Sequence, residues 1–221
     1  MEKNKIRNEV LEKVKYALKS VRNTDYDKNN SLSFSNNLLK SKTDDISKFK
    51  LNLEKVNGNV IEVNDVIDII DHISNILKIN NCTKFSISNS NNLIKLGIKS
   101  HLLEEGFTLI DAYNKIELAE SEVGITEANY AISDTGTIVL FAGIDNPRSI
   151  SLVTPVHIAI LNSNYIVPNI FNLFKTFNDI NLLKSIPSCI TFITGPSRTA
   201  DIELILTLGV HGPKELYVLV Y

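Results

Sequence analysis

Apolar residues recur at helical spacing near the start of the chain, which predicts one amphipathic helix. The positions are Ile6, Val10, Val14, Ala17, Leu18 and Val21. A stretch rich in Asn, Ser, Lys and Asp then runs from Arg22 to Asp45, and this composition is typical of a linker. We therefore predict an N-terminal amphipathic helix and polar linker over residues 1–57, with the helix packed on this chain or on another subunit.

From Gly58 onward, short apolar runs alternate with longer amphipathic stretches, a pattern that predicts strands separated by helices. The expected strands cover residues 60–63, 84–88, 107–110, 128–133, 137–142, 156–161, 165–167, 188–194 and 215–220. The expected helices cover residues 65–78, 91–104, 113–122, 168–177 and 199–208. Helices between strands favour parallel pairing, whereas the tight Asp134-Thr135-Gly136 turn predicts one antiparallel hairpin. Residues 58–221 are thus expected to form an α/β domain with a mixed, largely parallel sheet flanked by helices.

The composition excludes several classes of protein. Hydrophobic residues make up 43% and charged residues 22% of the 221 residues, as expected for a globular chain. Only 2 Cys and 4 His are present, without a CxxC pair or two His residues four positions apart. The GxGxxG and GxxxxGK nucleotide-binding sequences are also missing. These features argue against a disulfide scaffold, a zinc site and an iron–sulfur cluster, so we expect no metal or cofactor in this chain.

The charge is nearly balanced but unevenly placed. The formal net charge is −2, while residues 1–50 hold 12 Lys and Arg against 7 Asp and Glu. These basic residues are scattered among polar ones, which favours a solvated surface over a nucleic-acid-binding arm. No apolar run approaches the roughly 18 residues of a membrane span, and the charged start of the chain is unlike a signal peptide. A cytoplasmic location is therefore expected.

The hairpin turn holds the first candidate site. Asp134, Thr135, Gly136 and Thr137 place a carboxylate and two hydroxyls beside a glycine. In a structural interpretation, Asp134 bonds to the turn backbone and Gly136 supplies a positive φ angle. In a functional interpretation, the same groups form a substrate-binding loop, in which Asp134 is a candidate catalytic group. The residues alone leave both interpretations open.

The second candidate site follows an apolar strand, a place where α/β sheets commonly bind ligands. Its sequence is Gly195-Pro196-Ser197-Arg198-Thr199-Ala200-Asp201. With a helix from Thr199, Ser197 or Thr199 would cap the first turn, and its N–H groups would bind an anion together with Arg198. Asp201 in the first turn would instead compete with that anion. Anion binding and a purely capped turn both stay open.

Arginine is scarce after residue 50, where nine Lys but only Arg148 and Arg198 occur. Arginine differs from lysine as a planar, bidentate donor, which suits carboxylate and phosphate groups. If Arg148, in the turn over residues 145–148, converges with Arg198 on one crevice, a small carboxylate or phosphate ligand is predicted there.

Histidine offers a third candidate site. His211 lies between flexible residues in Gly209-Val210-His211-Gly212-Pro213, where it is either a general acid–base group or a structural residue. His157 falls in an expected strand and is interpreted as packed there. Neither cysteine has an activating neighbour, which argues against nucleophilic catalysis.

Several of these pieces occur in the order found in one protein family. They are Gly124-Ile125-Thr126, the run from Ala131 to Thr137, Arg148, Pro155, His157, the run from Gly195 to Glu203, and the run from Gly209 to Pro213. From about Val60 to Tyr221, the chain closely resembles the LUD-domain family of lactate utilisation protein C (LutC/YkgG). The specific part is GPSRTADIE followed closely by GVHGP. Ser133 is a departure, because a small apolar residue is usual there.

The resemblance implies a sheet of the NagB/RpiA/CoA-transferase-like type and a role in oxidising L-lactate to pyruvate. It implies a non-redox component of a three-protein system whose iron–sulfur subunits carry the electrons. For this component, the residues themselves suggest an anionic ligand or partner held at the GPSRTAD loop. The alternative is a stand-alone enzyme, similar in fold to sugar-phosphate isomerases and CoA transferases, that acts on a phosphorylated or carboxylate substrate. In that alternative, Glu127 or Asp134 is the base or nucleophile.

Overall fold

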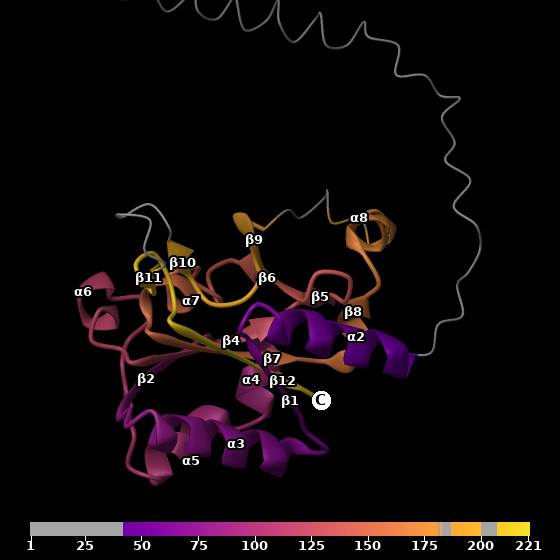
Figure 1. Cartoon of the computed structure of the whole chain (residues 1–221). Helices are drawn as coiled ribbons and strands as arrows, with labels where there is room; N and C mark the ends of the chain where they lie inside the picture. The colour runs from indigo at the N-terminus through magenta and orange to yellow at the C-terminus, as the bar shows by residue number, and fades with distance from the viewer. Residues whose placement is uncertain (1–41, 181, 183–186, 200–206) are drawn as a thin grey trace, which may run out of the picture. The chain divides into compact units, whose positions relative to one another are not determined.

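The computed structural model describes residues 42–180, 182, 187–199 and 207–221 (Figure 1). The helix predicted over residues 6–21, most of the polar stretch before Asp45, and Asp201 lie outside the described residues. The compact α/β unit spans Lys40–Tyr221, so it begins before the boundary predicted between residues 57 and 58. The earlier start comes from one further helix, α2 (Lys42–Glu54), whose Phe49 and Leu53 side chains are fully buried.

The main sheet has six parallel strands in the order β1-β12-β7-β4-β2-β3. In that order, the strands are β1 (Asn59–Glu62), β12 (Glu215–Val220), β7 (Val156–Leu161), β4 (Val123–Ala128), β2 (Lys84–Ile87) and β3 (Thr108–Leu109). The central strands are apolar along most of their length, as expected when both faces of a parallel sheet are covered. From β2 the chain continues to β3 at one edge of the sheet, whereas from β4 it continues in the opposite direction, to β7. α/β sheets commonly bind ligands where the strand order reverses in this way.

A second sheet of four strands contains the predicted hairpin. Its order is β8 (Ile166–Val167), β5 (Tyr130–Ile132), β6 (Thr137–Ala142) and β9 (Cys189–Ile193). β5 and β6 are antiparallel, with Ile132 opposite Thr137, which confirms the hairpin. β4 ends at Ala128 and β5 begins at Tyr130, so Asn129 marks the passage from one sheet to the other. The predicted largely parallel architecture is confirmed, with its antiparallel pairs outside the main sheet.

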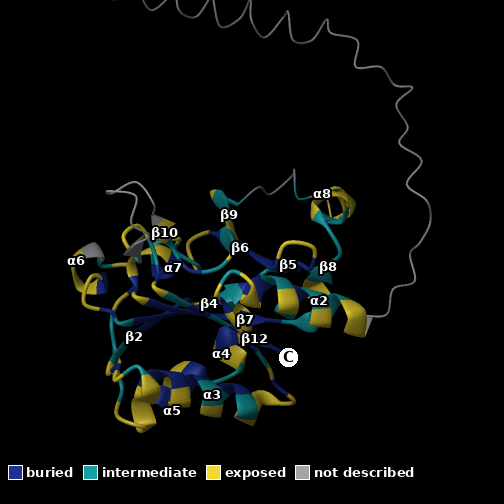
Figure 2. Cartoon of the chain, in the orientation of Figure 1, coloured by how far each residue is buried: buried dark blue, intermediate teal, exposed yellow. Residues whose placement is uncertain are grey.

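Helices and the second sheet cover the two faces of the main sheet (Figures 1 and 2). One face is packed by α3 (Val66–Ile79), α4 (Asn91–Lys95) and α5 (Ile98–Glu104). The other face is packed by α2 and by residues of β5 and β6. α8 (Ile170–Asp179) covers the outer side of the second sheet. The remaining short helices are α6 (Lys115–Leu118), α7 (Ile150–Val153) and the 3-10 helix Ser163–Tyr165.

The helix α3 shows how local sequence sets these elements. The Asp65 carboxylate accepts a hydrogen bond of 2.9 Å from the backbone N–H of Asp68, which caps the first turn. Ile69, Ile73 and Leu77 then recur on one face and are fully buried against the sheet. The predicted helix over residues 65–78 is therefore confirmed. In the part of the chain described here, no helix is long and apolar enough to cross a bilayer.

Two expected helices are interrupted or shortened, and strand β4 was not predicted. The helix expected over residues 91–104 is divided by Gly97, whose φ of 69° ends α4 before α5 begins. The helix expected over residues 113–122 is reduced to α6, and β4 follows it directly. A Cβ atom on Gly124 would lie 2.5 Å from the Ile150 carbonyl oxygen. This glycine weakens the local strand pattern, but it lets α7 lie directly against β4.

The helix expected over residues 199–208 is wrong at both of its described ends. Strands β10 (Arg198–Thr199) and β11 (Thr207–Leu208) pair there in antiparallel fashion. The N–H of Gly209 donates to the Ser197 carbonyl at 3.0 Å, which extends this pairing. Residues 200–206 lie outside the described residues. The two ends are thus held by a backbone contact that local helical spacing does not reveal.

Candidate functional site

The turn over residues 134–137 is joined to the end of β9 by a row of hydroxyl groups. Gly136 adopts the predicted left-handed conformation, with a φ of 63°. The Oγ1 atoms of Thr135 and Thr137 lie 2.6 Å apart, and Thr137 Oγ1 lies 2.7 Å from Thr194 Oγ1. Because Thr194 directly precedes Gly195, this row connects the first predicted site segment to the second.

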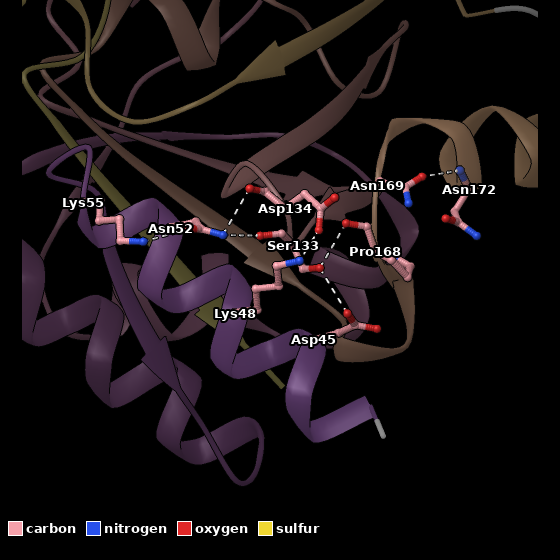
Figure 3. A network of polar contacts seen from close by, with 9 residues as sticks. All are labelled: Asp45, Lys48, Asn52, Lys55, Ser133, Asp134, Pro168, Asn169 and Asn172. Atoms are coloured by element: carbon pink, nitrogen blue, oxygen red, sulfur yellow. Dashed lines mark hydrogen bonds and ion pairs between the residues drawn. The ribbon is translucent and has the colours of Figure 1, made fainter. Parts of the chain in front are cut away.

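The helix α2 covers this turn (Figure 3). A Cβ atom on Gly136 would lie 2.6 Å from the carbonyl carbon of Asn52, so a glycine is needed for the helix to approach. The Asn52 side-chain amide donates to the carbonyl of Ser133 at 2.8 Å and to that of Asp134 at 3.1 Å. At the surface, Lys48 forms an ion pair with the Asp134 carboxylate. Asp134 is therefore held by α2 rather than left free beside the turn.

Ser133 joins the start of α2 to the hairpin. Its side chain is fully buried, and its Oγ lies 3.1 Å from both Asp45 Oδ1 and the Pro168 carbonyl oxygen, shown in Figure 3. The hydroxyl has one proton to donate to either acceptor. Ser133, which stands where a small apolar residue is usual in the resembling family, thus adds a polar link that an apolar residue would lack.

The contacts of α2 were missed by the sequence prediction. The segment's many Lys, Asp and Asn residues are typical of a linker. A signal was nevertheless present, since Ile46, Phe49 and Leu53 recur three and four residues apart. These apolar side chains pack into the core, whereas Lys48 and Asn52 reach the hairpin turn.

The turn after α2 also meets the second candidate segment. Gly195 has a φ of 82°, and a Cβ atom there would lie 2.7 Å from the Val56 carbonyl oxygen. The same carbonyl accepts a hydrogen bond of 2.5 Å from Arg198 Nη2. Arg198 is exposed, and its guanidinium forms no ion pair with a described residue. One N–H group is thus anchored, and within the described part of the chain no carboxylate pairs with the other donors of the guanidinium.

The third segment lies beside the second. The N–H of Ser197 donates to the Pro213 carbonyl at 2.8 Å, and a Cβ atom on Gly212 would lie 3.2 Å from Ser197 Cβ. His211 is exposed in this turn, and its ring forms no hydrogen bond with the described residues. The structure therefore brings the GPSR and GVHGP sequences together, while an acid–base role of His211 stays a prediction.

The other candidate residues lie elsewhere in the fold. Arg148 is exposed between β6 and α7 and lines a hollow of about 10 Å³, which Arg198 does not line. Glu127 is half-buried near the carboxyl end of β4, where its Oε1 accepts a hydrogen bond of 2.5 Å from Asn92. The convergence of Arg148 and Arg198 on one crevice stays a prediction. Thr199 lies in β10, and Asp201 is outside the described residues.

His157 is fully buried in β7, as predicted from its apolar neighbours. Its Nε2 lies 2.8 Å from Thr126 Oγ1, while Nδ1 has no hydrogen-bond partner. Burial away from water disfavours the charged ring and lowers the pKa of His157 to about 3. The residue is therefore neutral near pH 7 and is packed in the core.

The environment of Cys82 is not that of a reactive thiol. Cys82 is buried, and this burial, together with the negative charge of Glu122, raises the pKa of its thiol. Cys189 is half-buried at the start of β9 and also carries a free thiol. Within the described ranges, no group of three His, Cys, Asp or Glu side chains is arranged to hold a metal ion.

Comparison with known proteins identifies the family. The family model described as the LUD domain matches residues 46–221, from within α2 to the end of the chain. The chain belongs to the LUD domain family. The matched LUD domain thus includes most of α2, the hairpin turn and both signature loops, which agrees with the close packing of Gly136 on α2 and of Gly195 on Val56.

Curated relatives of this LUD domain are 30–42% identical to it over the aligned residues. Lactate utilization protein C of Anoxybacillus flavithermus is 30% identical over 171 residues, which cover 75% of this chain and 76% of that protein. Lactate utilization protein C of Bacillus subtilis is 42% identical over 46% of this chain and 43% of that protein. The uncharacterized protein YkgG of Escherichia coli is 36% identical over 61% of each chain. The match thus spans less than two thirds of the last two relatives.

A solved structure supports the fold. A DUF162 family protein from Deinococcus radiodurans superposes with a TM-score of 0.61 over 82% of this chain and 99% of that chain. The two sequences are 20% identical. The likeness therefore concerns the arrangement of the LUD domain's strands and helices.

Proposed function

We propose that this LUD domain protein takes part in lactate utilisation, as a non-redox component of a system that oxidises L-lactate to pyruvate. The observation that carries the proposal is the match to lactate utilization protein C of Anoxybacillus flavithermus, which covers 76% of that protein. Oxidation of lactate releases two electrons and two protons. With two widely separated cysteines, the chain has no ligand set for a cluster, so iron–sulfur subunits acting as partners in the cytoplasm would accept the electrons.

The GPSRTAD loop is the proposed contact point of this component. Val56 fixes one N–H group of Arg198, which holds the guanidinium at the surface beside the Gly195 and Ser197 turn. A planar guanidinium can hold a carboxylate through two parallel hydrogen bonds, a geometry that lysine does not offer. The bound group would be a small carboxylate or phosphate, or an acidic side chain of a partner subunit.

The alternative of a stand-alone enzyme requires a carboxylate poised beside Arg198. Among the described residues, Asp134 pairs with Lys48, Glu127 accepts from Asn92, and Arg198 pairs with no carboxylate. Both candidate bases are thus engaged by other side chains. This arrangement favours the role of a component over that of an isomerase-like or transferase-like enzyme.

Co-purification tests the proposed role. The full chain would carry an affinity tag and be produced together with the proteins encoded beside it. We expect a cysteine-rich, iron-containing protein to co-purify in a fixed ratio. Because lysine cannot form the two parallel hydrogen bonds of a guanidinium, we expect Arg198→Lys to reduce the recovery of that protein at least about tenfold. Recovery of the tagged chain alone at low and moderate salt would contradict the role of a complex component.

A further inference from the structure

A hollow of about 70 Å³ lies at the carboxyl ends of the paired strands β2 and β3. Its lining residues belong to none of the three candidate segments, and the sequence prediction gave them no role. Asn89 follows β2 and Asp111 follows β3, while Lys99 reaches the hollow from α5. The carboxyl ends of parallel strands are the common ligand-binding edge of α/β sheets.

Two opposite charges line this hollow without neutralising each other. Lys99 and Asp111 are both exposed, and neither forms an ion pair with a described residue. Asp111 Oδ1 accepts a hydrogen bond of 2.9 Å from the backbone N–H of Tyr113, which fixes the carboxylate at the rim. An ammonium group and a carboxylate on one hollow can together hold a ligand that carries both a carboxylate and a hydrogen-bond donor.

Tyr113 and Asn89 add neutral polar groups to the same rim. The Asn89 side-chain amide donates to the Tyr113 hydroxyl at 3.1 Å, so the phenolic proton remains available to an acceptor. Ile87, Leu109 and Ala112 supply an apolar part of the lining. The hollow therefore combines a cation, an anion, a hydroxyl donor and a small apolar surface.

We propose that this hollow binds a small carboxylate with a hydrogen-bond donor on the adjacent carbon, the chemistry shared by 2-hydroxy acids and 2-amino acids. The ligand carboxylate would lie at Lys99, and its hydroxyl or ammonium group would donate to Asp111. A methyl side chain would lie against the apolar lining. The site is argued from the hollow alone and does not rest on the proposed role of the protein.

The size of the hollow sets the size of the ligand. One water molecule needs roughly 10–15 Å³ of such volume, so the hollow holds about five water-sized groups. L-Lactate and L-alanine, with about six non-hydrogen atoms, match this size. So few atoms in an open hollow bind weakly, and we expect a Kd of about 1–10 mM.

Nuclear magnetic resonance of the ¹⁵N-labelled full chain can measure such weak binding. We expect L-lactate and L-alanine, each added to about 50 mM, to shift the amide signals of Asn89, Asp111 and Ala112. Propionate has the carboxylate but lacks the adjacent donor, so we expect it to bind at least about fivefold more weakly. The comparison of lactate with alanine then tells which of the two acids the hollow prefers.

Two variants and a control connect the signal to the charges. We expect Lys99→Met to weaken the binding of both acids at least about tenfold. Lys95 lies on α4 and outside the lining, so Lys95→Met should leave both affinities unchanged. Asn at position 111 can still accept from the Tyr113 N–H, so Asp111→Asn keeps the turn. Asp111→Asn is expected to weaken the binding of alanine more than that of lactate, because the neutral amide accepts from a hydroxyl but does not balance an ammonium charge.

Three results would overturn the proposal: no shift at about 50 mM ligand, equal binding of propionate and lactate, or unchanged affinity in Lys99→Met. Folding of each variant is verified by the dispersion of its other amide signals. Failure here leaves co-purification through Arg198 unaffected, so the site and the proposed role are tested separately.

Discussion

Gly136 packs against Asn52 so closely that a Cβ atom on the glycine would lie 2.6 Å from the Asn52 carbonyl carbon. This contact joins the hairpin turn of the second sheet to α2, the first described helix. The Val56 carbonyl, just after α2, makes the matching contacts with Gly195 and Arg198. The candidate loops are therefore arranged around α2 and the turn that follows it.

Gly136→Ala is expected to destabilise the protein. The φ of 63° disfavours any residue with a Cβ, and the added methyl group would also collide with the backbone of α2. We expect a loss of about 2–4 kcal/mol in the free energy of unfolding, measured with urea. At Gly143 nothing lies within 4 Å of a Cβ atom, so Gly143→Ala serves as the control and should change stability by less than about 1 kcal/mol. Equal losses in both variants would contradict the close packing of α2.

Asn52→Ala and Lys48→Met separate the two polar contacts of α2. Removal of the Asn52 amide leaves the carbonyls of Ser133 and Asp134 without a donor, and we expect a loss of about 1–2 kcal/mol. The ion pair of Lys48 with Asp134 is about 40% exposed on both sides, so its removal should cost less than about 0.5 kcal/mol. Urea unfolding of both variants measures the difference. A larger loss for Lys48→Met would show that charge, rather than the amide contacts, holds α2 on the turn.

Acid should weaken the fold through His157. Its pKa is about 3 in the folded chain and near 6.5 when unfolded, so the unfolded chain binds one more proton between these values. Stability is therefore full above about pH 6.5 and falls as the pH is lowered toward 3. From pH 6.5 to pH 5, this group alone should remove about 2 kcal/mol of the free energy of unfolding.

His157→Gln should flatten that part of the pH dependence, because glutamine has no proton to gain. His211→Gln changes an exposed histidine and serves as the matched control. Urea unfolding at pH 6.5 and pH 5 measures both variants against the original chain. Parallel pH dependences for His157→Gln and the original chain would mean that His157 is not buried in its neutral form.

The sequence predicted those elements whose signals are local. Asp65 and the Ile69, Ile73 and Leu77 stripe were sufficient for α3, and the Asp134-Thr135-Gly136 turn was sufficient for the hairpin. Strand β4 was not predicted, because Gly124 interrupts its apolar pattern. A glycine is present there because a Cβ atom would collide with Ile150 of α7. The helix expected from Thr199 was wrong at its ends, since the pairing of β10 with β11 depends on contacts between distant positions.

The candidate site could be predicted only in part, because contacts between segments distant in sequence leave no local signal. The sequence singled out the three segments, but it did not show that α2 links two of them through Asn52 and Val56. It also gave no role to Lys99 and Asp111, because unpaired opposite charges around one hollow are visible only in three dimensions.

Lactate-dependent dye reduction tests the central claim most directly. The purified full chain would be assayed alone, and again after mixing with the cysteine-rich proteins encoded beside it. Our account predicts no reduction by the chain alone, reduction by the mixture, and a rate at least about tenfold lower with Arg198→Lys. Lactate turnover by the chain alone would contradict the role of a non-redox component.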